Sequence, residues 1–464
     1  MSKRTGRTRA LAIVISLLTL SLLAGCSPKP ASQPTSAPTQ ETAQPTVAPS
    51  QQAQEPEAGK QPEDYTGTVL FWTWDDNYSN YMNPAFNEIY PNVAFQTAPV
   101  QAGDYLQKIQ TSMASGLELP DVIYAESDSR IRTFQLGLCE NLEAEPYNID
   151  RNDMFEYLWP RCEYEGNIVG LEMQLTPAAL GYRKDITKEV WGVEEAADIE
   201  KLFADAGGDY NSYITLGKQL LEKTDGQKLM FSSLGDVKTL VYNQSKQPLV
   251  NEDGSLNLSG RIMPCLTVMR DFVQAGIVGT IDQWTPQWEA SFATGTYAFF
   301  PFATWTTEPV ENDRDPDGAG HWGLCIPPMG AFSWGGTTQS LNKQSPNKES
   351  AWAYISWCTW SLEGSKAALE GRGYLNSRIS NYDKDPSLSS SYSDYYGMDL
   401  PKFWIEEAVA SAVTVTPTEY EQLVGDALGV AMTAFQADTA MSAEDMMEIV
   451  KTEIHNKEPN LELK

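Results

Sequence analysis

The side chains of this sequence that could do chemistry are tryptophans and carboxylates lying close together. Trp74 is followed directly by Asp75 and Asp76, and Glu126 and Asp128 follow a second apolar run. Aromatic faces stack on apolar surfaces of a ligand, and hydrogen bonds to carboxylates are about twice as strong as neutral ones. The pattern therefore favours recognition of a small polar molecule.

The sequence offers little for hydrolytic catalysis. His321 and His455 are the only two histidines, and no G-x-S-x-G occurs, which disfavours a Ser-His or Cys-His mechanism and a zinc site. Residues 340–343 and 345–348 both fit S-x-x-K, but no S-D-N or K-T-G accompanies them. A glycosidase that uses a pair of carboxylates remains open, because Asp and Glu are plentiful.

Asp313, Asp315 and Asp317 have the D-x-D-x-D-G spacing that opens a calcium loop. The twelfth position is Leu324, where a bidentate Glu is required, and Pro316 stiffens the middle. We therefore interpret this segment as an acidic surface turn, with calcium as the alternative. No cofactor is expected.

The elements that must position these side chains alternate in type. Residues 68–74, 92–96 and 121–125 resemble strands, and Leu106, Ile109 and Met113 are spaced as on a helix that ends near Gly116. Such alternation predicts a parallel sheet with helices on both faces, and ligands bind outside the carboxyl ends of its strands. That rule places residues 74–76 and 126–128 at the site.

Two of these positions have structural alternatives. Trp72 shares a strand face with Trp74 but lies further from the strand end, so we expect it in the core. Asp75 or Asp76 could instead cap the next helix.

Three further local signals are readable. Residues 251–254 predict a hairpin turn, Ser345-Pro346 a helix start, and Ser442 with Asp445 a variant capping box.

The first residues are typical of an export signal. Lys3, Arg4, Arg7 and Arg9 precede an apolar run from 10 to 24, which is too short for a spanning helix of about 20 residues. The run ends in residues 23–26, Leu-Ala-Gly-Cys, which resemble the bacterial lipobox. This resemblance implies cleavage after residue 25 and a lipid on Cys26. An ordinary signal peptide is the alternative.

Residues 26–63 contain eight prolines and no aromatic residue, so we expect a disordered stalk. The remaining 64–464 carry all 13 tryptophans and are more acidic than the whole chain, whose net charge is −29, because the first 25 residues are basic. So acidic a surface argues against nucleic acid and anionic lipid as partners. Their five cysteines could form one or two disulfides, and the spacing does not assign them.

Several segments in a shared order resemble the extracellular solute-binding proteins of sugar ABC importers. In the first half these are residues 119–128, 137–142, 170–176 and 181–185; in the second half they are 291–299 with Thr304-Trp305, then 335–338, 345–351 and 373–378. The sequence departs from the family at Glu172, where proline is usual.

The resemblance implies an α/β fold of two lobes, of the periplasmic-binding-protein type II, with ligand bound in the cleft between them. The N-terminal lobe would comprise 64–174 and 335–372, and the C-terminal lobe 175–334 and 373–464. The chain would pass between lobes near residues 172–176, 334–337 and 371–375, and the lobes would close on ligand by hinge motion.

The resemblance also implies ligand contacts. Glu126 and Asp128 match an acidic pocket position, Gln174 and Thr176 lie on the first passage, and Trp305 matches an aromatic platform. Trp334, Gly335 and Gly336 mark the second passage, and Tyr374 and Arg378 the far side, although Arg378 could instead form an ion pair between lobes. Trp284 and Trp288 either line the rim or pack. The expected ligand residues are Trp74, Asp75, Asp76, Glu126, Asp128, Gln174, Thr176, Trp284, Trp305, Trp334, Gly335, Gly336, Tyr374 and Arg378.

We therefore expect a non-enzymatic, monomeric binding protein, lipid-anchored at the outer face of the cell membrane. It would capture a mono- or oligosaccharide and deliver it to ABC permease subunits. A surface-anchored hydrolase with a carboxylate pair, a receptor for a non-sugar solute, and an adhesin or sensor partner are the alternatives.

Overall fold

The computed structural model describes residues 60–413 and 415–464. The signal segment 1–25, Cys26 and most of the predicted stalk lie outside the described residues. Within the stalk's last residues, Pro62–Asp64 form a 3-10 turn, η1. None of the helices described is both long and apolar enough to cross a membrane.

The first sheet has the strand order β2-β1-β3-β11-β6. Its strands are β1 (Gly67–Thr73), β2 (Val93–Pro99), β3 (Val122–Glu126), β6 (Leu171–Glu172) and β11 (Thr337–Leu341). β1 is parallel to β2 and β3, whereas β11 is antiparallel to both β3 and β6. The predicted parallel sheet is thus confirmed only for the first three strands.

The helices after β1 and β2 follow the sequence prediction closely. α1 (Asp76–Asn87) is capped by Asp75, whose carboxylate accepts from the backbone N–H of Tyr78. α2 (Ala102–Ser115) ends at Gly116, which adopts the left-handed φ of 64° that glycine tolerates best.

The second sheet has the order β10-β7-β8, with β9 also paired to β7. Its strands are β7 (Pro177–Arg183), β8 (Phe299–Ala303), β9 (Trp322–Cys325) and β10 (Phe332–Ser333), and every pairing is antiparallel. β8 begins only at the end of the family-like segment 291–299.

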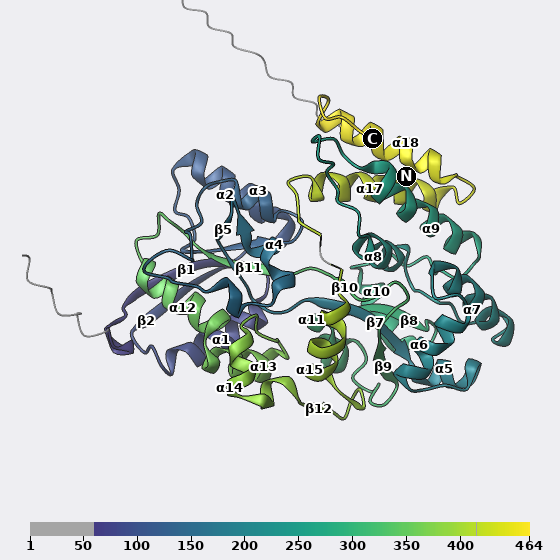
Figure 1. The fold of residues 1–464 in the computed structure, drawn as a ribbon, viewed down its shortest axis with the longest axis horizontal. Coiled ribbons are helices and arrows are strands. Elements are labelled where there is room, and N and C mark those ends of the chain that lie inside the picture. Colours follow the sequence, from purple (N-terminus) through teal and green to yellow (C-terminus); the bar gives the residue numbers. More distant parts are fainter. Residues whose placement is uncertain (1–59, 414) are drawn as a thin grey trace, which may run out of the picture. The chain divides into compact units, whose positions relative to one another are not determined.

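Two short segments carry the chain between the sheets (Figure 1). Residues 173–176 join β6 to β7, and 334–336 join β10 to β11. Leu175 donates its N–H to the carbonyl of Leu375 at 2.7 Å, so the third expected passage lies beside the first. After this passage, residues 376–381 form hydrogen bonds with Asp153, Trp360 and Ser361 of the predicted N-terminal lobe. The predicted lobe boundaries stay a prediction.

The remaining helices surround the two sheets. They are α3 (Arg130–Phe134), α4 (Trp159–Cys162), α5 (Lys184–Trp191), α6 (Ala196–Asp205), α7 (Tyr210–Lys223), α8 (Leu234–Gln244), α9 (Met263–Gln274), α10 (Pro286–Ser291), α11 (Thr304–Pro309), α12 (Lys348–Trp360), α13 (Leu362–Arg372), α14 (Ile379–Lys384), α15 (Leu400–Lys402), α16 (Val409–Ser411), α17 (Glu421–Ala437) and α18 (Ala443–Lys457). Two hydrophobic clusters form the interior: one contains β1 and β3, and the other contains α7, α9 and α17.

The local signals have mixed outcomes. The capping box of Ser442 and Asp445 is confirmed at the start of α18, and residues 251–254 form a turn with Gly254 at φ 84°. The helix start predicted at Ser345-Pro346 is wrong by two residues, because α12 begins at Lys348. Ser345 instead donates its hydroxyl to Asp121 at 2.5 Å.

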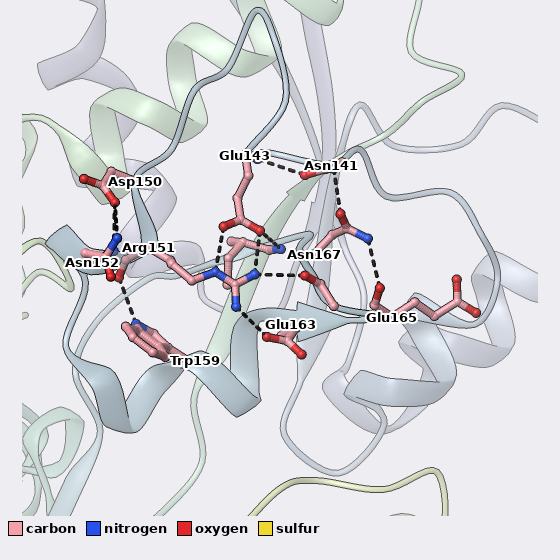
Figure 2. Close-up of polar contacts among 11 residues, drawn as sticks. Asn141, Glu143, Asp150, Arg151, Asn152, Trp159, Glu163, Glu165 and Asn167 are labelled. Carbon is pink, nitrogen blue, oxygen red and sulfur yellow. Dashed lines mark hydrogen bonds and ion pairs between the residues drawn. The ribbon is translucent and has the colours of Figure 1, made fainter.

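A small hairpin, β4 (Glu163–Tyr164) with β5 (Asn167–Ile168), is held by Arg151, as Figure 2 shows. Arg151 binds both carboxylate oxygens of Glu143 at 2.6 Å and one oxygen of Glu163 at 2.8 Å. A second hairpin pairs β12 (Tyr392–Ser393) with β13 (Met398–Asp399).

The five cysteines of the described residues are all buried and free. They are Cys139, Cys162, Cys265, Cys325 and Cys358. Burial raises the pKa of Cys139 to about 11 and that of Cys265 to about 12, so these thiols stay protonated at neutral pH. The disulfides allowed for by the sequence are not formed.

Candidate functional site

A cavity of about 670 Å³ lies where the carboxyl ends of β1 and β3 meet the two connecting segments and the N-terminal part of α11. Eleven of the fourteen residues expected to contact ligand line it: Trp74, Asp75, Glu126, Asp128, Gln174, Trp284, Trp305, Trp334, Gly335, Gly336 and Tyr374. The size falls within the range of about 300–1,000 Å³ typical of small-molecule pockets. The strand-end rule therefore located the cavity correctly.

Three tryptophans form an aromatic cluster on the cavity wall. Trp284 stacks on Trp305 with ring centroids 5.9 Å apart and planes 23° apart, and Trp334 lies 4.7 Å from Trp305. The indole N–H of Trp305 donates to the carbonyl of Trp334 at 3.0 Å, which fixes its ring. Trp284 is 56% exposed and has a left-handed φ of 67°, a conformation that costs a bulky residue energy.

The neighbouring tryptophans belong to the interior. Trp288 is fully buried, and its indole N–H donates to Asp236 at 2.9 Å. Trp72 is also buried, which confirms the expectation for that residue. Trp74 is half-buried and packs edge-on against Tyr105 and Tyr124, with centroids 5.3 and 5.4 Å away.

Asp75 caps α1 and also lines the cavity. Its capping oxygen, Oδ1, lies 3.7 Å from Arg372 Nη2, and Oδ2 accepts from the Tyr374 hydroxyl at 3.1 Å. The carboxylate is thus fixed where it faces the cavity. Asp76 is exposed in the first turn of α1 and does not line the cavity.

Glu126 presents a half-buried carboxyl group at the end of β3. Its oxygens accept from Thr337 Oγ1 at 2.7 Å and Ser127 Oγ at 2.8 Å, and burial raises its pKa. Asp128 lies on the same loop and also lines the cavity. Together these groups can accept several hydroxyl hydrogen bonds.

Two buried arginines beneath the cavity were not found from the sequence. Arg130 and Arg161 each contact Glu172 Oε1 at 2.9 Å, and they also donate to the carbonyls of Gly336 and Gly335. Glu172 is fully buried at the end of β6. One carboxylate thus ties the second connecting segment to α3 and α4.

Gly336 is required by this arrangement. Its φ is 105°, and a Cβ built there would lie 2.2 Å from Arg161 Nη2. A side chain would therefore displace the arginine.

Two further predicted residues do not line the cavity. Thr176 is fully buried; its N–H lies 3.1 Å from the Tyr157 hydroxyl, and its carbonyl accepts from the Trp334 N–H. Arg378 pairs with Asp153 at 2.7 Å and lies over the Trp360 ring. The Thr176 side chain packs in the interior, and the Arg378 side chain is engaged by Asp153 and Trp360.

The cavity also has a polar corner that the sequence did not indicate. Lys238, Thr239, Tyr242 and Asn243 of α8 line it together with Arg261 and Glu421. Residues i and i+4 of a helix share a face, so a signal existed at 238/242 and 239/243. It was missed because no strand end or family motif pointed to α8.

The weak calcium candidates do not form a metal site. Asp315 is buried, accepts from the Trp322 indole N–H at 2.8 Å and lies 3.6 Å from Arg183. In the described part of the chain, no group of three or more His, Cys, Asp or Glu side chains could hold a metal ion.

The chain was compared with known protein families and proteins. The family described as bacterial extracellular solute-binding protein matches residues 82–393. A lactose-binding protein of Rhizobium radiobacter is 25% identical over 304 residues, which cover 62% of this chain and 69% of that protein.

Solved structures share the fold. An extracellular solute-binding protein of family 1 matches with a TM-score of 0.72 at 16% identity, over 84% of this chain and 99% of its own. The ABC transporter associated binding protein of B. animalis subsp. lactis, solved with beta-1,6-galactobiose, matches with a TM-score of 0.68 at 17% identity, over 86% and 100%.

Proposed function

We propose that this chain, which belongs to the bacterial extracellular solute-binding proteins, captures a carbohydrate in the cavity and delivers it to an ABC importer. The chain is thus related to binding proteins of sugar transport rather than to enzymes. The proposal concerns the ligand class, the site residues, the permease partner and the membrane anchor.

The observation that carries the carbohydrate proposal is the pairing of an aromatic cluster with fixed carboxylates in one cavity. Trp284, Trp305 and Trp334 offer flat faces for the C–H surfaces of a sugar ring, while Asp75 and Glu126 are held by hydrogen bonds to accept its hydroxyls. A relative that is a lactose-binding protein and a neighbour in fold that was solved with beta-1,6-galactobiose support a carbohydrate ligand.

Delivery by lobe closure is the proposed mechanism. The segments 173–176 and 334–336 connect the two sheets and both border the cavity. Rotation about them would bring the α8 and Trp305 side of the cavity toward Asp75 and Glu126, enclosing the sugar. No covalent chemistry is needed, since affinity and closure suffice for transport.

The proposed location rests on the sequence alone. Lipidation of Cys26, followed by the predicted stalk, would hold the protein at the outer face of the membrane and raise its effective concentration near the permease.

A thermal-shift screen against mono- and oligosaccharides tests the function. Ligand binding stabilises the native state by mass action, so at least one sugar should raise the Tm of the wild type and leave Trp305→Ala unshifted. Trp191→Ala, which removes a tryptophan outside the cavity, is the matched control and should respond like the wild type.

The bound sugar should be recovered intact after incubation. If no carbohydrate raises the Tm, the ligand class is wrong and other solutes must be tried. If the sugar is cleaved, the protein is a hydrolase instead.

A further inference from the structure

The cavity wall differs in charge from the chain as a whole. The chain has a formal net charge of −29, yet the lining contains five Lys or Arg residues and four Asp or Glu residues. Arg130 and Arg161 are paired with Glu172, and Arg372 contacts both Asp75 and Glu308. The two other cations, Lys238 and Arg261, lie at the polar corner.

Lys238 has no carboxylate partner among the described residues. It is half-buried on α8, and its ammonium lies 5.5 Å from the centroid of the Tyr242 ring. A lysine on a cavity wall in so acidic a chain would ordinarily find a counter-ion. Here the contact is a cation–π interaction, which leaves its hydrogen-bond donors available.

Arg261 contacts the same ring. Its guanidinium carbon lies 4.5 Å from the Tyr242 centroid, and the residue is only 5% exposed. Nη1 donates to the carbonyl of Gln247 at 2.6 Å, but Nε is buried without an acceptor. An unsatisfied donor on a buried charged group is costly, and this one belongs to a residue that lines the cavity.

Glu421, at the start of α17, is an acidic residue that lines the cavity together with these cations. Glu421 accepts from the Tyr242 hydroxyl at 2.8 Å and from Thr418, so its oxygens are already engaged. Burial raises its pKa, and the charge of Asp128 adds to this effect, whereas Arg261 opposes it. In the described part of the chain, neither Glu421 nor Asp128, which also lines the cavity, forms an ion pair with Lys238 or Arg261.

We propose that this corner binds a carboxylate of the ligand, so that the transported sugar is an acidic carbohydrate containing a uronic acid unit. This inference rests on the proposed function. A carboxylate beside Tyr242 would provide the counter-ion that Lys238 lacks and would also be attracted by the charge of Arg261 on the same ring, while the neutral part of the sugar occupies the tryptophan cluster. Lys238 is the specificity-determining residue because it is the cation without a partner.

The test is a calorimetric comparison of uronic acid disaccharides with their carboxyl-reduced counterparts, which differ only in that group. The wild type should bind one of the acidic forms at least tenfold more tightly than its reduced counterpart. Lys238→Met should lose that preference and keep its affinity for the reduced sugar. Lys246→Met, which removes an exposed lysine two residues beyond α8, is the control and should retain the preference.

Lys238→Arg tests the charge independently of side-chain loss and should restore most of the preference. The inference is overturned if the wild type favours the reduced sugars, or if Lys238→Met weakens both forms equally. If neutral sugars bind and acidic ones do not, the inference fails while the proposed function stands. If neither series binds, the inference fails, and the thermal-shift screen against other sugars decides the carbohydrate function separately.

Discussion

Arg130 and Glu172 form an ion pair of 2.9 Å in which the side chains are 1% and 0% exposed. Arg161 shares the same carboxylate oxygen, and the second oxygen of Glu172 has no partner. The group joins the end of β6 to α3, α4 and the glycine segment 335–336. It thereby fixes the cavity floor.

Replacing Glu172 should destabilise the fold strongly. In Glu172→Gln two buried arginines lose their counter-ion, and breaking a buried pair in this way costs about 3–5 kcal/mol. Denaturant unfolding measures the change. Glu163→Gln is the control, because its partner Arg151 keeps Glu143 (Figure 2) and exposed pairs contribute about 0–1 kcal/mol. Equal losses in the two variants would contradict this role of Glu172.

Trp284 should show the cost of its backbone conformation. At φ 67° glycine is unstrained whereas alanine is not, so Trp284→Gly should be more stable than Trp284→Ala by about 1 kcal/mol. Chemical denaturation of both variants measures the difference. A more stable alanine variant would mean that the left-handed conformation is absent from the native protein.

Asp236 should make stability depend on pH. Burial raises its pKa to about 7, and an unfolded aspartate titrates near 3.9. The folded protein therefore holds a proton that the unfolded chain releases, so this contribution is complete below about pH 4 and is lost as pH rises through about 7.

The slope within that window is about 1.4 kcal/mol per pH unit for one proton. Between pH 5 and pH 8, the unfolding free energy should decrease more in the wild type than in Asp236→Asn. The asparagine retains an acceptor for Trp288 and Gln283. An identical pH dependence in both proteins would contradict the buried acid.

Cys26→Ser should separate binding from uptake. Without the proposed lipid the protein should be released from the cell, bind its sugar with unchanged Kd and support little transport, because the effective concentration at the permease falls. Cell fractionation and uptake of labelled sugar are the measurements. Normal uptake by a fully released variant would show that the tether is dispensable.

Much of this fold could be predicted because its signals are local. The apolar runs that form β1, β2 and β3, Gly116 after α2 and the capping box of α18 depend on residues next to one another in the chain. The antiparallel pairings of β11 with β3 and of β8 with β7 could not be derived in this way, since they depend on where distant segments enter each sheet.

The same distinction between local and distant signals applies to the site residues. Asp75 and Glu126 were predicted because a parallel strand places the residues after it at the ligand-binding edge. Arg130 and Arg161 were missed because their positions depend on Glu172, which is more than ten residues away in sequence. Lys238 was missed because its partner Tyr242 lies on a helix face that no sequence signal connected with the site. Arg378 was predicted to contact the ligand but pairs with Asp153, which lies 225 residues away in sequence.

A calorimetric titration of the wild type and Trp305→Ala with the sugar that gives the largest thermal shift tests the carbohydrate site most directly. We predict saturable one-to-one binding by the wild type and a loss of at least 2 kcal/mol, about thirtyfold in Kd, in Trp305→Ala, because buried aromatic anchors dominate binding energy. Unchanged affinity in Trp305→Ala would place the ligand elsewhere. Absence of saturable binding by the wild type would contradict the function.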